Sequence, residues 1–261
     1  MKSPAILSGR PPQERRSVER LLAPLETVAE SSPRFISNSL GEFENGGRTY
    51  SLPRFIYLGA KGGGDTIRIG IFATIQGNEP EGALALSRLV DVLEANPEIS
   101  KGYALFLYPI CNPTGFEDNT SHSRNGKNLD QEFWNDSVEP EVRYLQSEIW
   151  MHAFDGIITL RSDRISEGFS GHAAGAILSE HLLDPALREA EQFLPRGHGR
   201  VIRDGNCQLA KSPSGLRRPP FEIVLQTPQS APLHRQVAAF SAALQTILVE
   251  YRYLIAIAQN I

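Results

Sequence analysis

Charged and amide side chains directly follow four apolar runs of the sequence. They lie in the segments IQGNE (75–79), YPICNPTG (108–115), ITLRSD (158–163) and IVLQTP (223–228). A carboxylate such as that of Glu79 can bind a cation, whereas the guanidinium of Arg161 offers only hydrogen-bond donors and stays charged. Gln76 and Gln226 offer neutral amides, which form hydrogen bonds but take no proton from water near neutral pH.

The surrounding pattern predicts how these residues are positioned. Strands are expected at 54–60, 66–75, 102–110, 154–162 and 220–228, after two short strands joined by a turn at 45–47. Helices are expected at 17–31, 82–93, 139–153 and 233–258. The alternation predicts an α/β protein, a three-layer α/β/α sandwich with a mixed, mostly parallel twisted sheet. Ligands of such sheets bind beyond the carboxyl ends of the strands, so the four polar segments are expected to converge.

The remaining segments carry weaker signals. The polar stretch 111–136 is long for a connection and is expected to form part of a site. The segment 168–205 is expected to be irregular, with a helix around 182–194, and the triple glycine 62–64 to be a hairpin turn. We expect one domain over 1–261, with 1–40 as an N-terminal helical extension and Ser17 as a helix cap.

Composition excludes several classes of partner. With 261 residues, a net charge of −4 and a pI near 5.9, the chain has no electrostatic reason to bind nucleic acid or an anionic membrane. No apolar run approaches the roughly 20 residues of a membrane span, and the first residues do not resemble a signal peptide. Cys111 and Cys207 are expected to be reduced, although a disulfide between them remains open. These features favour a cytoplasmic protein that binds a small polar ligand.

Five segments together resemble a known family. GIFATIQGNEPEG, YPICNPTGF, SRNGKNLDQEFW, DGIITLRSD and FEIVLQTP follow the order of the signature segments of the zinc carboxypeptidases, nearest the branch of succinylglutamate desuccinylase and aspartoacylase. The resemblance runs from about residue 42 to about residue 250. It implies the metallopeptidase fold and an active site for zinc-dependent hydrolysis.

The positions of the family's zinc ligands are altered. Where the family has His-Gly-x-Glu, this chain has Gln76-Gly77-Asn78-Glu79, and Arg161 stands where the family has a further ligand histidine. A catalytic zinc ion takes about three protein ligands from Cys, His or carboxylate side chains. Because Arg161 has no lone pair and stays positively charged, we expect zinc, and any other cofactor, to be absent.

The substrate-binding and catalytic positions of the family are altered as well. The arginine that polarises the scissile carbonyl is kept as Arg124, but the Asn-Arg pair that holds the substrate carboxylate is replaced by Asp130 and Gln131. Asp130 would repel such a carboxylate by roughly 1–4 kcal/mol. Gln226 replaces the general base, so the resemblance implies no catalytic residue in this chain.

Other readings of these residues remain open. Each replaced position could be an ordinary solvated loop residue, and a relocated metal site would need histidines. No two of the six histidines have the helical spacing of three or four residues, and only His122 lies in the long loop. Asp163 and Glu167 are expected to be surface charges, and Trp134 and Trp150 core anchors.

The exchanges suggest a hypothesis for the altered site. A buried Glu79 without a metal ion needs another cation, and we expect Arg161 within salt-bridge reach, less than about 6 Å away. Gln76 and Gln226 would line a polar pocket, with Arg124 beside Asp130. The chain is therefore interpreted as a noncatalytic, carboxypeptidase-like protein (a pseudoenzyme) that binds a small polar or peptide-like ligand. The alternatives are a zinc-dependent carboxypeptidase or N-acyl amino acid deacylase with a non-standard site, and a structural or subunit-interaction role.

Overall fold

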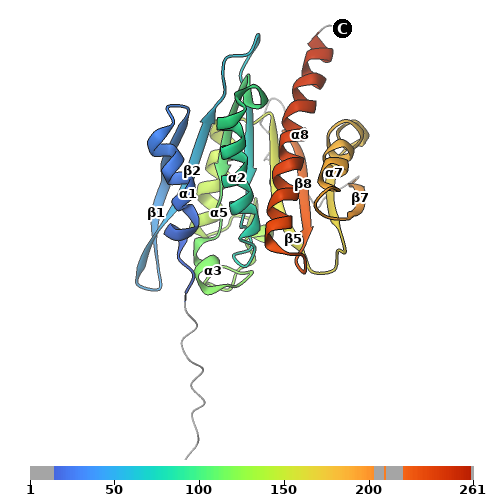
Figure 1. Cartoon of the computed structure of the whole chain (residues 1–261). Helices are drawn as coiled ribbons and strands as arrows, with labels where there is room; N and C mark the ends of the chain where they lie inside the picture. The colour runs from blue at the N-terminus through green and yellow to red at the C-terminus, as the bar shows by residue number, and fades with distance from the viewer. Residues whose placement is uncertain (1–14, 203–208, 210–219, 260–261) are drawn as a thin grey trace, which may run out of the picture.

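The computed structural model describes residues 15–202, 209 and 220–259 (Figure 1). The strands are β1 (Phe35–Asn45), β2 (Arg48–Leu58), β3 (Ile67–Phe72), β4 (Tyr103–Tyr108), β5 (Gly156–Asp163), β6 (Phe169–Ala174), β7 (Arg196–Ile202) and β8 (Phe221–Pro228). The helices are α1 (Val18–Ser31), α2 (Glu81–Ala95), α3 (Pro113–Asp118), α4 (Leu129–Glu132), α5 (Pro140–His152), α6 (Ala176–Leu178), α7 (Asp184–Ala190) and α8 (Leu233–Gln259). A 3-10 turn, η1 (Pro97–Ser100), follows α2, and a π-helical turn, η2 (Ser179–Leu183), leads into α7.

The strands form one sheet in the order β1-β2-β4-β3-β5-β8-β6-β7. The neighbours β3–β4, β3–β5, β5–β8 and β6–β7 are parallel, and β1–β2, β2–β4 and β6–β8 are antiparallel. Four of the seven pairings are parallel, which confirms the predicted mixed, mostly parallel sheet.

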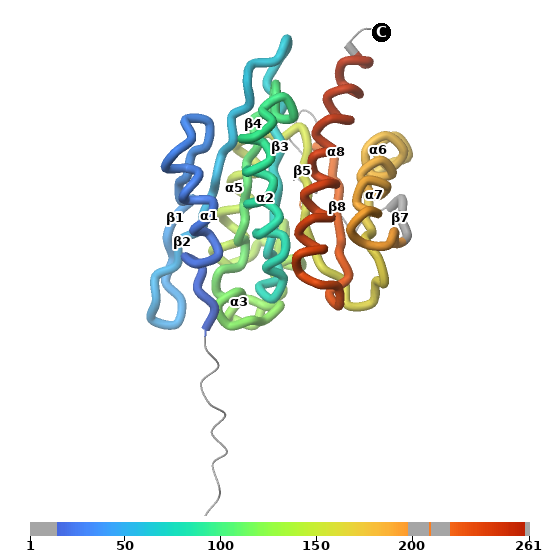
Figure 2. The backbone as a smooth tube through the Cα atoms, viewed as in Figure 1, coloured from blue at the N-terminus to red at the C-terminus, as the bar shows by residue number. Residues whose placement is uncertain are grey.

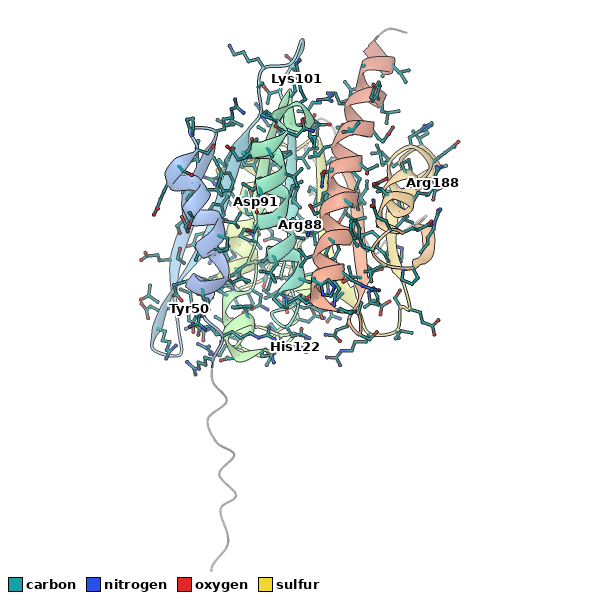
Figure 3. The ribbon with its side chains drawn as sticks, in the orientation of Figure 1. Tyr50, Arg88, Asp91, Lys101, His122 and Arg188 are labelled. Atoms are coloured by element: carbon teal, nitrogen blue, oxygen red, sulfur yellow. The ribbon has the colours of Figure 1, made fainter. Side chains whose placement is uncertain are left out.

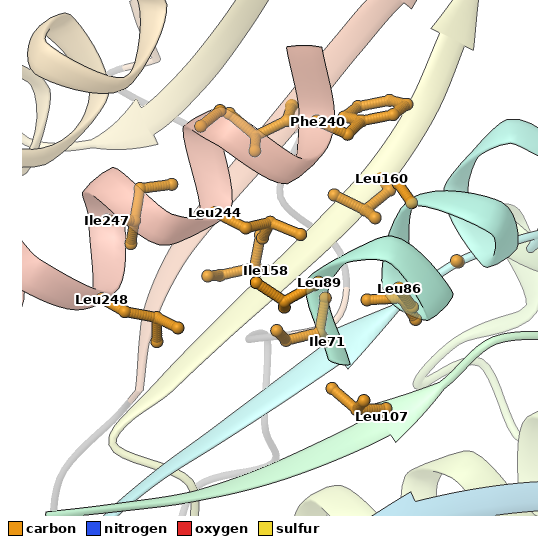
Figure 4. Packing of buried hydrophobic residues seen from close by; sticks show 14 of the residues in the cluster. Ile71, Leu86, Leu89, Leu107, Ile158, Leu160, Phe240, Leu244, Ile247 and Leu248 are labelled. Carbon is orange, nitrogen blue, oxygen red and sulfur yellow. The ribbon is translucent and has the colours of Figure 1, made fainter. Parts of the chain in front are cut away.

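Helices cover both faces of the sheet, as the prediction required. The helices α1, α2, α7 and α8 lie on one face and α5 on the other (Figures 1 and 2). Strand β3 is nearly continuously apolar because both of its faces are buried. Ile69 and Ile71 face α2 and α8, while Phe72 belongs to the cluster on the α5 face. Figure 4 shows Leu86 and Leu89 of α2 packed among these side chains.

The first helix and the first strand correct the predicted N-terminal extension. Ser17 caps α1 by accepting a hydrogen bond from the backbone N–H of Arg20, as expected. However, Leu22 and Leu25 are buried in the main core, and β1 begins at Phe35. Residues 35–40 therefore belong to the sheet rather than to a helical extension.

Two further predictions about strands were wrong. Residues 62–64 join β2 to β3, which are not neighbours because β4 lies between them, so the triple glycine is not a hairpin turn. Residues 168–205 were expected to be irregular apart from one helix, yet they include β6 and β7. The predicted turn at 45–47 does join two antiparallel strands, but each strand has 11 residues rather than a few.

The C-terminal helix is a core element. By length and composition, Leu233–Ala258 could cross a membrane, and it is the one described helix that passes this test. Phe240, Leu244 and Leu248 are nevertheless buried against the sheet, and the Leu248 carbonyl accepts a hydrogen bond from the Tyr103 hydroxyl at 2.6 Å. Its C-terminal turns extend past the sheet, at the top of Figure 1.

The predicted tryptophan anchors differ from each other. Trp134 is half-buried, and its indole N–H donates to the carbonyl oxygen of Leu209 at 3.2 Å. Trp150 was predicted to anchor the core, but it is 49% exposed on the outer side of α5.

Candidate functional site

The loop that follows β3 is held by the neighbouring strand-end loop. The backbones of Ala73 and Thr74 accept hydrogen bonds from the N–H groups of Cys111 and Asn112. Thr74 is fully buried with φ +53°, a conformation that is strained for a β-branched residue. Its hydroxyl donates to the carbonyl oxygen of Glu79 at 3.1 Å, so the loop curls back on itself. This local frame directs the Gln76 and Glu79 side chains toward the end of β5.

Gly77 lets this loop approach α3 closely. A Cβ atom at Gly77 would lie 2.0 Å from the carbonyl carbon of Gly115 and 2.2 Å from the nitrogen of Phe116. No side chain fits there. Glycine at this position is explained by backbone contact alone and needs no catalytic role.

Arg161 bridges two carboxylates. Its Nε lies 3.2 Å from Glu79 Oε2, and its Nη1 lies 2.5 Å from Asp130 Oδ1. The Glu79 side chain is 3% exposed, and those of Arg161 and Asp130 are 16% and 21% exposed. The predicted Glu79–Arg161 salt bridge is confirmed, and Asp130, at the start of α4, is a second partner of the same guanidinium.

Gln76 completes the cluster. With its amide nitrogen toward Glu79, it donates to Glu79 Oε1 at 3.2 Å, and its oxygen accepts from Arg161 Nη2 at 2.5 Å. The opposite orientation places the amide oxygen against acceptors only and leaves a single 3.4 Å bond to Asp130. We therefore assign the first orientation, in which Gln76 bonds to both members of the Glu79–Arg161 pair. We call Gln76, Glu79, Asp130 and Arg161 the Arg161 cluster.

The charges of the Arg161 cluster do not balance if both carboxyls are ionised. The pKa of Glu79 is raised to about 7, mainly by burial and also by the carboxylates of Glu81 and Asp130, against the opposing attraction of Arg161. Burial alone would lower the pKa of Arg161, but Asp130 and Glu79 outweigh it and raise that pKa. Burial, which the guanidinium of Arg161 offsets only in part, explains why Glu79 holds a proton more readily than usual.

The cluster does not fit a catalytic metal ion. Both carboxylates are engaged by Arg161, whose cationic nitrogens lie in the coordination space of Glu79. Gln76 contributes an amide rather than an imidazole. Among the described residues, no three His, Cys, Asp or Glu side chains are grouped so that they could hold a metal ion. The donor set around Glu79 lacks the three ligands that zinc requires.

Gln226 lies next to Arg161 but outside the cluster. The two residues are register partners on β5 and β8, so their side chains leave the same face of the sheet. Gln226 lines a pocket of about 770 Å³ that extends from β8 toward the neighbouring strand β6, together with Asp163 and residues of β6. Gln226 was predicted to line one polar pocket together with Gln76, but Gln76 is not part of the lining of this pocket.

Arg124 lies elsewhere, which corrects its predicted place beside Asp130. Its guanidinium binds Asp118 through Nε at 2.7 Å and Nη2 at 2.9 Å, contacts Glu117 at 3.3 Å, and donates to the Tyr50 hydroxyl. Tyr50 is labelled at the lower left of Figure 3. The hydrogen bond to Asp118 raises the pKa of Arg124 most strongly. These partners leave Arg124 in a structural network between β2 and α3.

Two other candidates also lie outside the cluster. Gln131 is exposed on α4, and its side chain makes no hydrogen bond with a described residue. His122 is exposed at the lower edge of the molecule in Figure 3 and contacts the Ser121 hydroxyl. Neither residue contacts Glu79, so neither supplements its ligand set.

Solved structures identify the fold. No protein-family model and no curated protein sequence match the chain. A metallo-carboxypeptidase from Burkholderia cenocepacia matches with a TM-score of 0.73 and 18% identity, over 92% of this chain and 70% of that chain. A metallo-carboxypeptidase from Pseudomonas aeruginosa matches with a TM-score of 0.67 and 19% identity, over 90% and 69%. The chain has the metallo-carboxypeptidase fold.

The second predicted branch is also represented. A succinylglutamate desuccinylase/aspartoacylase from Rhodobacter sphaeroides matches with a TM-score of 0.59 and 17% identity, over 84% of this chain and 65% of that chain. At these identities the matches establish the metallo-carboxypeptidase fold but not the activity, which has to be argued from the residues of the site. In this chain the loop after β3, strand β5 and helix α4 carry the Arg161 cluster.

Several residues around the site were missed by sequence reasoning. Glu117 and Asp118, which bind Arg124, lie only seven and six residues before it, so opposite charge at short spacing was an available signal. Ser170 and His172 of β6 line the pocket beside Gln226, but the strand that carries them was not predicted. Asp163, expected to be a surface charge, is half-buried in the same pocket.

Proposed function

We propose that this protein is a noncatalytic member of the metallo-carboxypeptidase fold, in which Arg161 replaces the metal ion, and that it binds a small polar or peptide-like ligand beside that position. The observation that carries the proposal is the pair of salt bridges from Arg161 to Glu79 and Asp130. A guanidinium satisfies the buried carboxylate but cannot lower the pKa of water as a metal ion does.

The remaining residues support the same conclusion. Gln226 offers no basic group, and Gln76 is held by hydrogen bonds within the Arg161 cluster. Arg124, which would polarise a carbonyl, is bound by Asp118 and Glu117. Hydrolysis of an amide would need a nucleophile, a base and an electrophile, and these positions supply none of the three.

Metal analysis tests the proposal directly. Protein expressed with added zinc is expected to carry no stoichiometric metal after purification. It is also expected to release no product from C-terminal peptides or N-acyl amino acids. The matched control is the double variant Gln76→His/Arg161→His, which places two imidazoles beside Glu79 and so provides three possible protein ligands. This variant is expected to retain zinc. A positive signal from it would show that the metal analysis can detect zinc bound at this position.

The alternative of a working hydrolase predicts the opposite result. About one equivalent of zinc in the parent protein, lost in Glu79→Gln, would contradict the proposal. Hydrolysis that stops on chelation would contradict it equally.

A further inference from the structure

The sheet has an open edge at β1. In the strand order β1 pairs with β2 on one side, and no described strand lies on its other side. Figures 1 and 2 show β1 at the margin of the molecule, opposite the margin that β7 forms. An open edge exposes backbone N–H and C=O groups that can pair with a strand of another chain.

The pairing of β1 with β2 shows which backbone groups point outward. The first part of β1 is in regular antiparallel register with β2 up to Ser39, and just before it the N–H of Leu58 donates to the carbonyl oxygen of Arg34. Hydrogen-bonded and non-hydrogen-bonded pairs alternate in such a ladder. Every second residue after Arg34 therefore bonds β2, whereas Ser37 and Ser39 direct their backbone N–H and C=O groups away from it. Pro53, which has no N–H, lies opposite Ser39, where the alternation needs none.

These two serines are open to solvent. Both are exposed, and together with Asn38 they line a groove of about 740 Å³ beside α1. The Ser37 hydroxyl donates to Glu26 of α1 at 3.0 Å, so this helix lies over one face of the strand and not over its edge. Within the described part of the chain, no loop or side-chain hydrogen bond uses the backbone groups of either serine.

The sequence at this edge is symmetric about Asn38. Outward from Asn38, Ser37 matches Ser39 and Ile36 matches Leu40, and we call residues 36–40 the ISNSL segment. When two copies pair antiparallel with Asn38 at the centre, each residue lies opposite its match. Ser37 of one copy then exchanges N–H and C=O bonds with the partner's Ser39. The backbone groups that point outward are therefore the ones that this two-fold pairing uses.

The side chains match in the same way. Ile36 is 43% exposed, and in the pair it packs on the partner's Leu40, since opposite residues leave the same face of a sheet. Asn38 Oδ1 accepts from Arg54 Nε at 2.9 Å, and no described residue accepts from the Asn38 amide nitrogen. Each Asn38 can therefore donate to the other at the two-fold axis, where opposite Cα atoms lie about 4.5 Å apart.

Charge favours the antiparallel arrangement. Arg34 and Glu42 are both exposed and flank the ISNSL segment at opposite ends. Antiparallel pairing brings each arginine toward the partner's Glu42, whereas parallel pairing brings like charges together. The segment itself contains no charged residue and no proline, which are the residues that usually protect an edge strand. The other edge strand, β7, has two arginines in the sequence RGHGRVI and offers no such symmetric, uncharged stretch.

We propose that two copies of this chain associate through their ISNSL segments, which continue the sheet antiparallel across a two-fold axis at Asn38. The proposal goes beyond the proposed function and is independent of it, because β2 and β4 separate β1 from β3 and the Arg161 cluster. The register shift between Ser39 and Glu42 bends the strand after the segment. The pairing is therefore short, and the dimer is expected to dissociate on dilution.

Sedimentation velocity over a concentration series tests the backbone pairing. The parent protein is expected to change from monomer to dimer as its concentration rises. Ser37→Pro removes an outward N–H, which an edge strand tolerates, and is expected to raise the dimer dissociation constant about tenfold or more because each copy loses a bond. The matched control is Ser37→Ala, which also loses the hydroxyl bond to Glu26 but keeps the N–H, and it is expected to dimerise like the parent.

Three results of this series would overturn the proposal. The first is a parent protein that stays monomeric at every concentration up to the limit of solubility. The second is an unchanged dissociation constant in Ser37→Pro. The third is equal weakening in Ser37→Pro and Ser37→Ala, which would assign the effect to the lost hydroxyl rather than to the backbone.

Disulfide trapping tests the register and does not depend on the folding of Ser37→Pro, which circular dichroism checks. Asn38→Cys places two thiols at the two-fold axis, at a Cα separation that a disulfide can span. On oxidation with copper phenanthroline in air, this variant is expected to form linked dimers. Glu44→Cys, at an exposed position of β1 beyond the register shift, is expected to form none above the level of the parent protein. Equal yields in the two cysteine variants, or no linked dimer in Asn38→Cys, would overturn the proposal.

Discussion

Replacing Arg161 with methionine should expose the electrostatic role of the Arg161 cluster. Methionine fills a similar volume but removes both salt bridges. Glu79, which is 3% exposed, would then be a buried carboxylate without a counterion. Breaking a buried ion pair by removing one partner typically costs about 3–5 kcal/mol.

The geometry supports a loss of that size. At the 3.2 Å separation of Arg161 Nε and Glu79 Oε2, an effective dielectric of about 20 gives a gross attraction of about 5 kcal/mol. Desolvation of each ion takes back several kcal/mol, so the intact pair contributes little net stability. The variant loses the attraction but retains the cost of burying Glu79, and its free energy of unfolding falls accordingly.

The loss should depend on pH. The pKa of Glu79 is already raised to about 7 by burial, with Arg161 holding it down, so removing Arg161 raises it further. A carboxyl that binds its proton more tightly when folded destabilises the protein as pH rises above the unfolded pKa, about 4.3, until it ionises in the folded state. Arg161→Met is therefore expected to cost about 3–5 kcal/mol near pH 8.5 and distinctly less near pH 5.5, where Glu79 stays protonated.

Urea unfolding of four proteins measures this coupling. The parent, Arg161→Met, Glu79→Gln and the double variant form a double-mutant cycle, and the double variant should recover most of the loss. Arg164→Met is the matched control, because Arg164 is exposed and, among the residues that the structure describes, its side chain bonds only Gln229. A loss below about 1 kcal/mol in Arg161→Met near pH 8.5, or no rescue by Glu79→Gln, would refute the reasoning.

Three further variants test other parts of the structure by the same unfolding measurement. Burial raises the pKa of Glu141 to about 7, so Glu141→Gln should stabilise the protein by up to about 3 kcal/mol near pH 8.5 and by little near pH 4.5; a loss at high pH would contradict this. Gly77→Ala should destabilise by about 3 kcal/mol or more because its Cβ would overlap the Gly115 backbone, and an unchanged midpoint would show that α3 can move away. Arg124→Ala should lower stability by roughly 2 kcal/mol because its hydrogen bonds to Asp118 are lost, and an unchanged unfolding midpoint would show that these bonds add nothing measurable to stability.

The fold was predictable where local pattern and burial agree. The central strands β3, β4, β5 and β8 are apolar runs buried on both faces, and their positions were predicted. Strand β6, with the sequence FSGHAA, has a glycine and small residues that give little β propensity, so pairing with β8 and β7 stabilises it rather than its own sequence. The position of β6 is therefore determined by its partner strands β7 and β8 and not by its own residues, so its sequence alone does not predict it.

The part of the site that was predictable is the ion pair of Glu79 and Arg161, because each of these buried charges needs a counterion. Glu79 and Arg161 stand 82 residues apart, but each needs a counterion at the same end of parallel strands, so their pairing followed from the sheet. From the sequence, Arg124 could form an ion pair either with Asp130 or with Glu117 and Asp118. Which pair forms depends on how the loop after β4 folds. Since Asn119 ends α3 with φ +53°, the chain turns there and brings Arg124 back onto Asp118.

The strain at Thr74 shows how the backbone of the Arg161 cluster is held in place. Its positive φ persists because the flanking residues Ala73 and Ile75 are held by hydrogen bonds from Cys111 and the side chain of Asn112. None of these bonds involves the Arg161 cluster, so the backbone positions of Gln76 and Glu79 are set by the strand ends rather than by the group that Glu79 binds. The same frame should hold its shape in Arg161→Met, which is why the double-mutant cycle reports electrostatics and not refolding.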